Sequence, residues 1–272
     1  GNNDYALFSN QLDLSNNFTL SFDIKSNTTQ NEINPILFKG DGLNCENEYA
    51  EIAIYFGNGG LSIKINSDTQ SSNYYAFSTP TILNEWIKVS IVSSSGYYSI
   101  YYDGQLSEIV YLGYIINTGY EMYIGLNQNI NGEGCQTYYL NGKIDNIELW
   151  NSAITNSEIQ EYSNCSLSGN EEGLIGYWGF EEGNGTTALD LGGNENDGTI
   201  NGATYSNDVH EQTCQVVLCS SSDEINVTFN ICGCNDETAC NYDSNVTEDN
   251  GSCVYILDDY CDCDSNILDC NS

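Results

Sequence analysis

Oxygen-bearing side chains alternate along a short stretch near the C-terminus of this 272-residue chain. Four of them stand at every second position and a glycine follows: Asp243, Asn245, Thr247, Asp249 and Gly251. Calcium takes six to eight hard oxygen ligands from carboxylates, amides and backbone carbonyls, which such a run supplies. We therefore expect a calcium-binding loop here. The alternative is a polar turn that Cys240 or Cys253 closes through a disulfide.

A second run of the same chemistry lies at the end of the chain. Its candidate ligands are Asp262, Asp264 and Asn266, and two further aspartates precede them. Carboxylates at this density repel one another unless cations bind between them. The sequence therefore predicts a second calcium site.

The charge balance of the whole chain points the same way. There are 39 acids and 5 bases, which gives a formal net charge of −34. All five bases are lysines, and none follows Lys143. A nucleic-acid ligand or an anionic membrane surface requires cations, so neither is an expected partner. Self-repulsion of this size favours bound counterions, and we expect Ca²⁺ to be the cofactor.

Cysteine is concentrated in the same acidic region. Nine of the 12 cysteines fall between Cys214 and Cys270, in a segment with few apolar residues. This density is typical of a disulfide framework in an oxidising compartment. A zinc site is disfavoured because His210 is the only histidine. Neither a signal peptide nor an apolar run of membrane length is seen, so we expect a mature fragment of a larger secreted or cell-surface protein.

Short stretches with period-two alternation fill the first 150 residues. In NFTLSFDIK, apolar residues at 18, 20, 22 and 24 alternate with polar ones, and Asp103-Gly104 forms a tight-turn signal between two such stretches. The pattern predicts an all-β sandwich or barrel. Only one helix is expected, a short one of about two turns within residues 151–164, with Thr155 as its N-cap and Glu158 completing a capping box.

Several stretches of the sequence resemble a known protein family. The stretches ILFKG, NEWIKVSIV, IYYDGQ and LNGKIDNIELW, in this order, resemble the laminin G-like domains of the concanavalin A-like superfamily over about residues 1–163. The resemblance implies a jelly-roll β-sandwich followed by a small disulfide-rich, irregular C-terminal segment. Residues 171–209 resemble the segment that usually opens such a domain. They either begin a truncated second copy or fold back and complete the first, as in a circular permutant.

We expect the fold-back, because too few residues precede Cys214 for a second sandwich. The expected domains are a laminin G-like sandwich at 1–164, a fold-back segment at 165–213 and an acidic, disulfide-rich tail at 214–272. The tail resembles a short acidic repeat of large exported surface proteins of marine bacteria. Other domains of the same polypeptide are therefore expected partners.

The family resemblance also implies a calcium ion at the sandwich. Asp145 matches the aspartate that clamps this ion, and loop residues supplied by the fold-back segment would complete the site: Asp190, Asn196 and Asp197. The alternative is that Asp145 merely caps a sheet edge. Catalysis is not expected. Glycosidases of the same fold use E-x-D-x-x-E on one strand, and Lys143 replaces the first glutamate here.

Tyrosine is the most conspicuous aromatic residue, with 21 copies, several in doublets such as Tyr74–Tyr75. One member of each doublet should face solvent if it lies on a strand. Exposed rings suit sugar stacking, although tyrosine also suits any half-buried pleated surface. We therefore expect a non-catalytic adhesion module that binds a glycan or another cell-surface ligand. The alternatives are a structural repeat of a stalk or filament, and an accessory domain of a polysaccharide-degrading enzyme.

Overall fold

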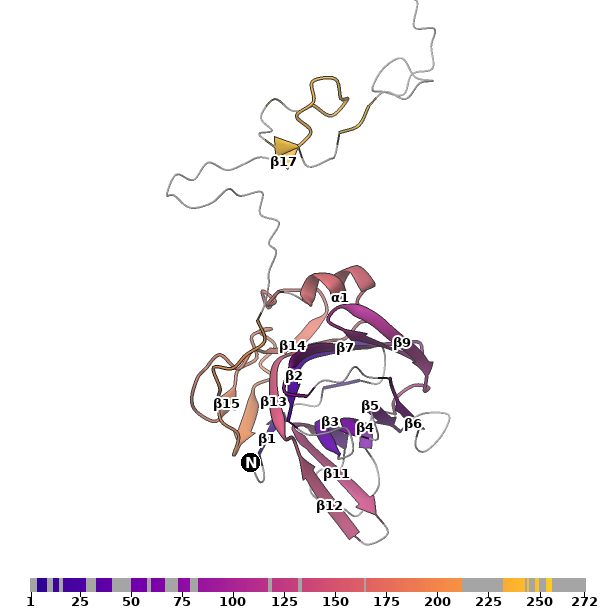
Figure 1. The fold of residues 1–272 in the computed structure, drawn as a ribbon, viewed down its shortest axis with the longest axis vertical. Coiled ribbons are helices and arrows are strands. Elements are labelled where there is room, and N and C mark those ends of the chain that lie inside the picture. Colours follow the sequence, from indigo (N-terminus) through magenta and orange to yellow (C-terminus); the bar gives the residue numbers. More distant parts are fainter. Residues whose placement is uncertain are drawn as a thin grey trace, which may run out of the picture. The chain divides into compact units, whose positions relative to one another are not determined.

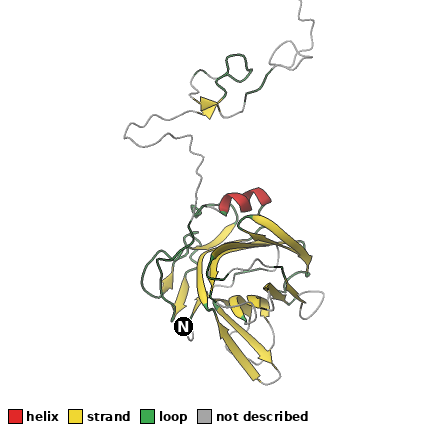
Figure 2. Cartoon of the chain, viewed as in Figure 1, coloured by secondary structure: helices red, strands yellow, loops and turns green. Residues whose placement is uncertain are grey.

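The computed structural model describes two compact units, Gly1–Cys214 and Gln215–Ser272, which are treated separately below. The described residues are 4–8, 12–14, 17–27, 33–40, 50–57, 60–66, 73–78, 83–116, 119–131, 134–163, 165–211, 232–242, 244, 248–249 and 253–255. Within them strands dominate and a single short helix occurs (Figure 2). No helix of the described residues is long and apolar enough to cross a membrane.

The first unit contains an eight-stranded antiparallel sheet (Figure 1). Its strands, in spatial order, are β15 (Thr187–Ala188), β16 (Gly198–Asn201), β1 (Tyr5–Phe8), β10 (Met122–Ile124), β3 (Asn34–Gly40), β4 (Ala50–Gly57), β5 (Gly60–Ile65) and β6 (Asn73–Ala76). A hairpin of β11 (Leu126–Asn131) and β12 (Gly134–Tyr139) continues from β10 and contacts β3. The strands of this sheet come from both ends of the unit's sequence.

A six-stranded antiparallel sheet forms the second layer. Its spatial order is β14 (Leu174–Trp178), β13 (Gly142–Trp150), β2 (Phe18–Ser26), β7 (Trp86–Ser94), β8 (Tyr97–Tyr102) and β9 (Gln105–Tyr111). The Asp103-Gly104 turn joins β8 to β9, and its positive φ angles of 46° and 73° explain why Gly follows Asp there. The predicted hairpin at this position is confirmed.

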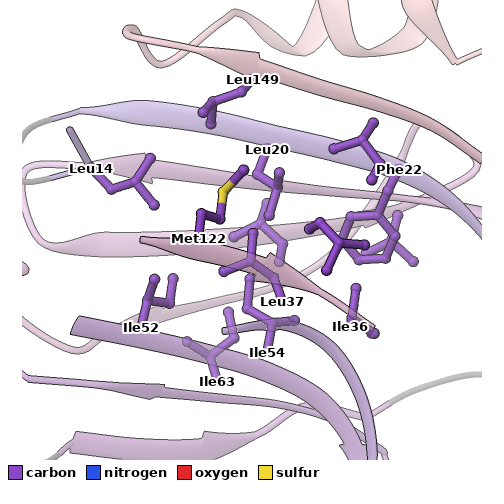
Figure 3. Packing of buried hydrophobic residues seen from close by; sticks show 14 of the residues in the cluster. Leu14, Leu20, Phe22, Ile36, Leu37, Ile52, Ile54, Ile63, Met122 and Leu149 are labelled. Atoms are coloured by element: carbon purple, nitrogen blue, oxygen red, sulfur yellow. The ribbon is translucent and has the colours of Figure 1, made fainter. Parts of the chain in front are cut away.

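The core lies between the two sheets, where the period-two pattern places the apolar side chains. Phe18, Leu20, Phe22 and Ile24 of β2 are at most 1% exposed and meet residues of β3, β4 and β5. Figure 3 shows Leu20, Phe22 and Leu149 packing towards side chains of the opposite sheet. Alternation buries one face of each strand and leaves the other face for polar residues. The predicted all-β, jelly-roll sandwich is confirmed.

Helix α1 (Asn156–Tyr162) packs over the outer face of the six-stranded sheet. Thr155 Oγ1 accepts from Glu158 N, and Glu158 Oε2 accepts from Thr155 N at 2.6 Å. The predicted capping box is therefore confirmed. Ile159 is buried against Val92 and Tyr101, which covers part of the sheet that would otherwise be apolar and exposed.

Residues 174–201 supply strands to both sheets. β14 pairs with β13, and β16 pairs with β1, so that Gly198 lies opposite Phe8. The Trp178 ring lies 4.5 Å from the Phe8 ring, and both side chains are buried. These residues therefore belong to the core of the first unit.

The second unit is held by covalent and polar contacts. Cys234 and Cys253 form a disulfide, and Cys240 is also disulfide-bonded. β17 (Cys232–Gly233) pairs in parallel with β18 (Glu248–Asp249). The Asp236 carboxylate accepts from Thr238 and from the Tyr255 hydroxyl at 2.9 Å. Within the described residues of this unit, a disulfide and polar contacts join the segments, as is typical of small cysteine-rich domains.

Candidate functional site

A single row of paired residues crosses the outer face of the eight-stranded sheet, the face turned away from the core. The strand registers place its members in this order: Thr187, Thr199, Leu7, Tyr123, Phe38, Ala53, Lys64 and Tyr74. Phe38, Ala53 and Tyr123 in the middle are buried together with Leu126, which begins the β11–β12 hairpin. Only the end of the row over β5 and β6 presents a large exposed aromatic side chain.

That open end forms what we call the tyrosine–lysine surface, made of Tyr55, Ser62, Lys64 and Tyr74. The rings of Tyr55 and Tyr74 are stacked, with centroids 6.5 Å apart and planes 23° apart. Tyr74 is 45% exposed, and its hydroxyl lies 3.2 Å from Ser62 Oγ. Burial, together with the neighbouring Tyr74 hydroxyl, raises the pKa of Tyr55 to about 12. An exposed aromatic ring and neighbouring hydroxyl groups therefore lie side by side on this surface.

The five lysines divide sharply by their partners. Four are engaged in ion pairs: Lys39 with Glu51, Lys88 with Glu148, and both Lys25 and Lys143 with Asp208. Lys64 is half-buried and has no ion-pair or hydrogen-bond partner within the part of the chain that the structure describes. The tyrosine–lysine surface therefore carries the one lysine whose charge no described carboxylate neutralises.

An acidic cluster occupies the outer face of the six-stranded sheet. Lys88 Nζ donates to Glu148 Oε1 at 2.6 Å, and Asp23 lies directly opposite Lys88 in the β2–β7 register. Asn146, in a bulge of β13 with φ 45°, donates from Nδ2 to Asp23 Oδ2 at 2.9 Å. Burial raises the pKa of Glu148 to about 7 and that of Asp145 to about 6. Three buried carboxylates, those of Asp23, Asp145 and Glu148, thus lie near one buried ammonium group, that of Lys88.

Residues 205–211, here called the strap, close this cluster. Asp208 accepts from Lys25, from Lys143 at 2.7 Å and from Trp86 Nε1 at 3.0 Å. These contacts hold the pKa of Asp208 far below its usual range. His210 Nδ1 lies 3.2 Å from Asp23 Oδ1, and this contact raises the pKa of His210. Asp145 and Glu148 are left 6% and 0% exposed.

Sequence reasoning missed the strap. The structure pairs His210, the only histidine of the chain, with the buried Asp23. Neither Asp208 nor His210 stands near its partners in sequence, because Lys25, Trp86 and Lys143 come from three different strands. Lysine is scarce in this chain, and this scarcity was the only feature of the sequence that could have drawn attention to the partners of Lys25 and Lys143. Both lysines bind the same carboxylate, that of Asp208.

Three of the predicted calcium ligands, Asp190, Asn196 and Asp197, lie in the loop between β15 and β16. The fourth, Asp145, lies in β13. Asp190 Oδ1 accepts from Tyr177 N and Gly192 N, and Asp190 Oδ2 accepts from Asn194 N and Asn196 N. Asp197 Oδ1 accepts from Asp190 N, and Asn196 Nδ2 donates to Ile175 O. Each oxygen of Asp190 therefore already accepts two N–H groups, which a calcium ion would have to displace.

Most of the candidate calcium ligands in the tail lie outside the described residues. Asp243, Asn245, Thr247, Asp262, Asp264 and Asn266 lie outside the described residues, and Asp249 is described only as part of β18. Across the described ranges, no group of three or more His, Cys, Asp or Glu side chains is arranged to hold a metal ion. Calcium binding therefore stays a prediction.

Comparison with known proteins identifies the family. Residues 1–160 match the laminin G-like model described as the concanavalin A-like lectin/glucanases superfamily, and the chain belongs to this superfamily. A comparison with curated proteins found no match.

Several solved structures share the fold at low identity. A putative carbohydrate-binding protein from Bacteroides ovatus is 18% identical, with a TM-score of 0.54 over 74% of this chain and 56% of that one. A heptameric SAP-like pentraxin from Limulus polyphemus is 20% identical, with a TM-score of 0.46 over 61% of this chain and 78% of that one. This chain thus spans little more than half the length of the Bacteroides protein. At such identities the likeness concerns the fold alone.

Proposed function

We propose that this chain is a non-catalytic binding module of a larger secreted or cell-surface protein, and that it binds a glycan at the tyrosine–lysine surface. The observation that carries the proposal is the exposed Tyr74 ring stacked on Tyr55, with hydroxyl groups at its edge. The C–H faces of sugars pack on aromatic rings while their hydroxyls bond to polar groups nearby. An adhesive role follows if the glycan belongs to a cell surface or matrix.

The acidic cluster argues against hydrolysis. Asp145 and Glu148 are the two acids that align with the catalytic pattern of glycosidases of this fold. Both are buried, and Glu148 is ion-paired with Lys88. A general acid and a nucleophile must flank a sugar bond directly. Carboxylates that a sugar cannot reach serve the architecture of the sheet and not a reaction.

Two further observations support the setting of the module. The disulfide Cys234–Cys253 fits an oxidising, extracellular compartment. The Bacteroides structure with the same fold is described as a putative carbohydrate-binding protein. Calcium is proposed to stabilise the acidic tail, because 39 acids face only 5 bases.

A glycan array probed with the full chain tests the proposal. We expect specific binding by the wild type and its loss in the Tyr74→Ala variant, because the exposed half of the aromatic platform is removed. The matched control is Tyr97→Ala, which truncates a tyrosine that is 52% exposed on the other sheet. A wild type that binds no glycan, or equal loss in both variants without unfolding, would overturn the proposal and leave the structural role.

A further inference from the structure

One lysine of this extremely acidic protein, Lys64, has no carboxylate partner among the described residues. The chain carries 39 acids, and every lysine except Lys64 has found a carboxylate within the described residues. Lys39 and Lys88 are buried in their pairs, whereas Lys25 and Lys143 hold the strap. A half-buried lysine that has no carboxylate partner among the described residues offers its ammonium group to an external anion.

The position of Lys64 connects it with the proposed ligand surface. Lys64 lies directly opposite Tyr74 on β6 and opposite Ala53 on β4, and Ser62 lies two residues along the same strand. Ala53 is small and buried, so no bulky neighbour on β4 covers the lysine side chain at that position. An anionic group of a sugar that stacks on Tyr74 would meet the Lys64 ammonium group on the adjacent strand.

From this placement, we infer that the glycan bound at the tyrosine–lysine surface is acidic, and that Lys64 determines this specificity by binding a carboxylate or sulfate group of the sugar. The inference rests on the proposed function and adds the ligand class to it. Tyr74 supplies the stacking face, the Tyr55 hydroxyl supplies a neutral hydrogen bond, and Lys64 supplies the only charge among the described residues of this surface. A neutral glycan would stack on Tyr74 and form the hydrogen bond, but it would make no ion pair with Lys64.

The negative net charge does not forbid an acidic ligand. At physiological ionic strength the Debye length is about 8 Å, so distant carboxylates are screened while a direct ion contact is not. Long-range repulsion slows the encounter, and added salt relieves it. We therefore expect the association rate to rise between low and physiological ionic strength, opposite to the usual behaviour of an acid-binding site on a basic protein.

A structural role for Lys64 predicts different behaviour. Lysine stems also cover apolar surface while the ammonium group remains in water, and such a lysine needs no ligand. Lys64→Met keeps the aliphatic stem and removes the charge, so it separates packing from binding. Lys64→Arg keeps the charge. Lys143→Met removes the same charge from the other sheet and is the matched control.

The test measures binding of the full chain and these variants to four immobilised probes: a neutral oligosaccharide, an oligouronate, a sialylated oligosaccharide and a sulfated oligosaccharide. We expect binding to at least one acidic probe, a loss of about tenfold or more in Lys64→Met, and retention in Lys64→Arg and Lys143→Met. The acidic probe that binds identifies the carboxylate or the sulfate.

Two results would overturn the inference, and they are distinguishable. If only the neutral probe binds, or if acidic probes bind equally well to wild type and Lys64→Met, the proposed function stands and the acidic ligand class is wrong. If the wild type binds no probe of any class, both are overturned. Circular dichroism and thermal melting of each variant show that a loss of binding is not a loss of folding.

Discussion

Lys88 Nζ lies 2.6 Å from Glu148 Oε1, and the two residues come from strands β7 and β13 on either side of β2. Both side chains are almost completely buried. The pair therefore reaches across β2, on which Asp23 lies opposite Lys88 and Ser21 lies opposite Glu148. An ion pair therefore links β7 to β13 across β2, on the face of the six-stranded sheet that is turned away from the core.

Breaking this pair on one side should be costly. Lys88→Met leaves the buried Glu148 carboxylate without its cation, and such a loss costs about 3–5 kcal/mol. The double variant Lys88→Met/Glu148→Met removes both charges and should cost less than the sum of the single variants. Urea denaturation measures the free energies of unfolding. Additive costs would show that the two groups do not interact.

Stability should fall as the pH rises from 5 to 8. Folding raises the pKa of Glu148 to about 7 and of Asp145 to about 6, so the unfolded chain releases these protons first and is favoured as pH increases. His210 adds to the trend, because its raised pKa gives stability below about pH 6.5 that is lost as the pH passes its folded pKa. We expect a decrease of roughly 2–4 kcal/mol in the free energy of unfolding.

The variant Asp145→Asn tests that assignment. It removes one of the titrating groups while keeping the shape of the side chain, so the pH dependence should flatten. Glu211→Gln removes the same charge from an exposed position and serves as control. Parallel pH profiles for wild type and Asp145→Asn would contradict the role of this carboxyl.

Packing of residues 174–201 against the core predicts a cost at Gly198. A Cβ atom at this position would lie 2.5 Å from Phe8 Cε1, and Phe8 is itself buried against Trp178. Overpacking of this kind costs about 1–3 kcal/mol. Gly198→Ala should therefore lower the unfolding midpoint in urea, whereas Thr199→Ala, at the exposed neighbouring residue, should change it little. No effect of Gly198→Ala would mean that β16 packs less closely.

Calcium should raise the thermal stability of the full chain, and chelation with EDTA should lower it. The physical reason is the formal net charge of −34, which divalent cations neutralise locally. Titration calorimetry of wild type and of the Asp243→Asn/Asp249→Asn variant measures how much of the binding uses the first acidic run. Identical melting temperatures in calcium and in EDTA would contradict the prediction that calcium stabilises the chain.

Local patterns in the sequence were sufficient for much of the fold. The alternation of Phe18, Leu20 and Phe22 predicted a half-buried strand, and Thr155 with Glu158 predicted the start of α1. Such features depend on residues a few positions apart, so they can be read without knowing the tertiary structure. The candidate site could not be read this way, because Tyr55 and Lys64 become neighbours of Tyr74 only through strand pairing.

By itself the sequence determined the acidic charge balance, the all-β class, the helix cap and the absence of the glutamate that catalysis would need at Lys143. Those properties follow from composition and from spacing along the chain. Only the tertiary structure decided which lysines would be neutralised. Register across β4, β5 and β6 places Lys64 beside Tyr74. The strap brings Asp208 to Lys25 and Lys143, which lie 183 and 65 residues away in sequence. Pairing over such distances is set by the packing of whole strands, which no local pattern encodes.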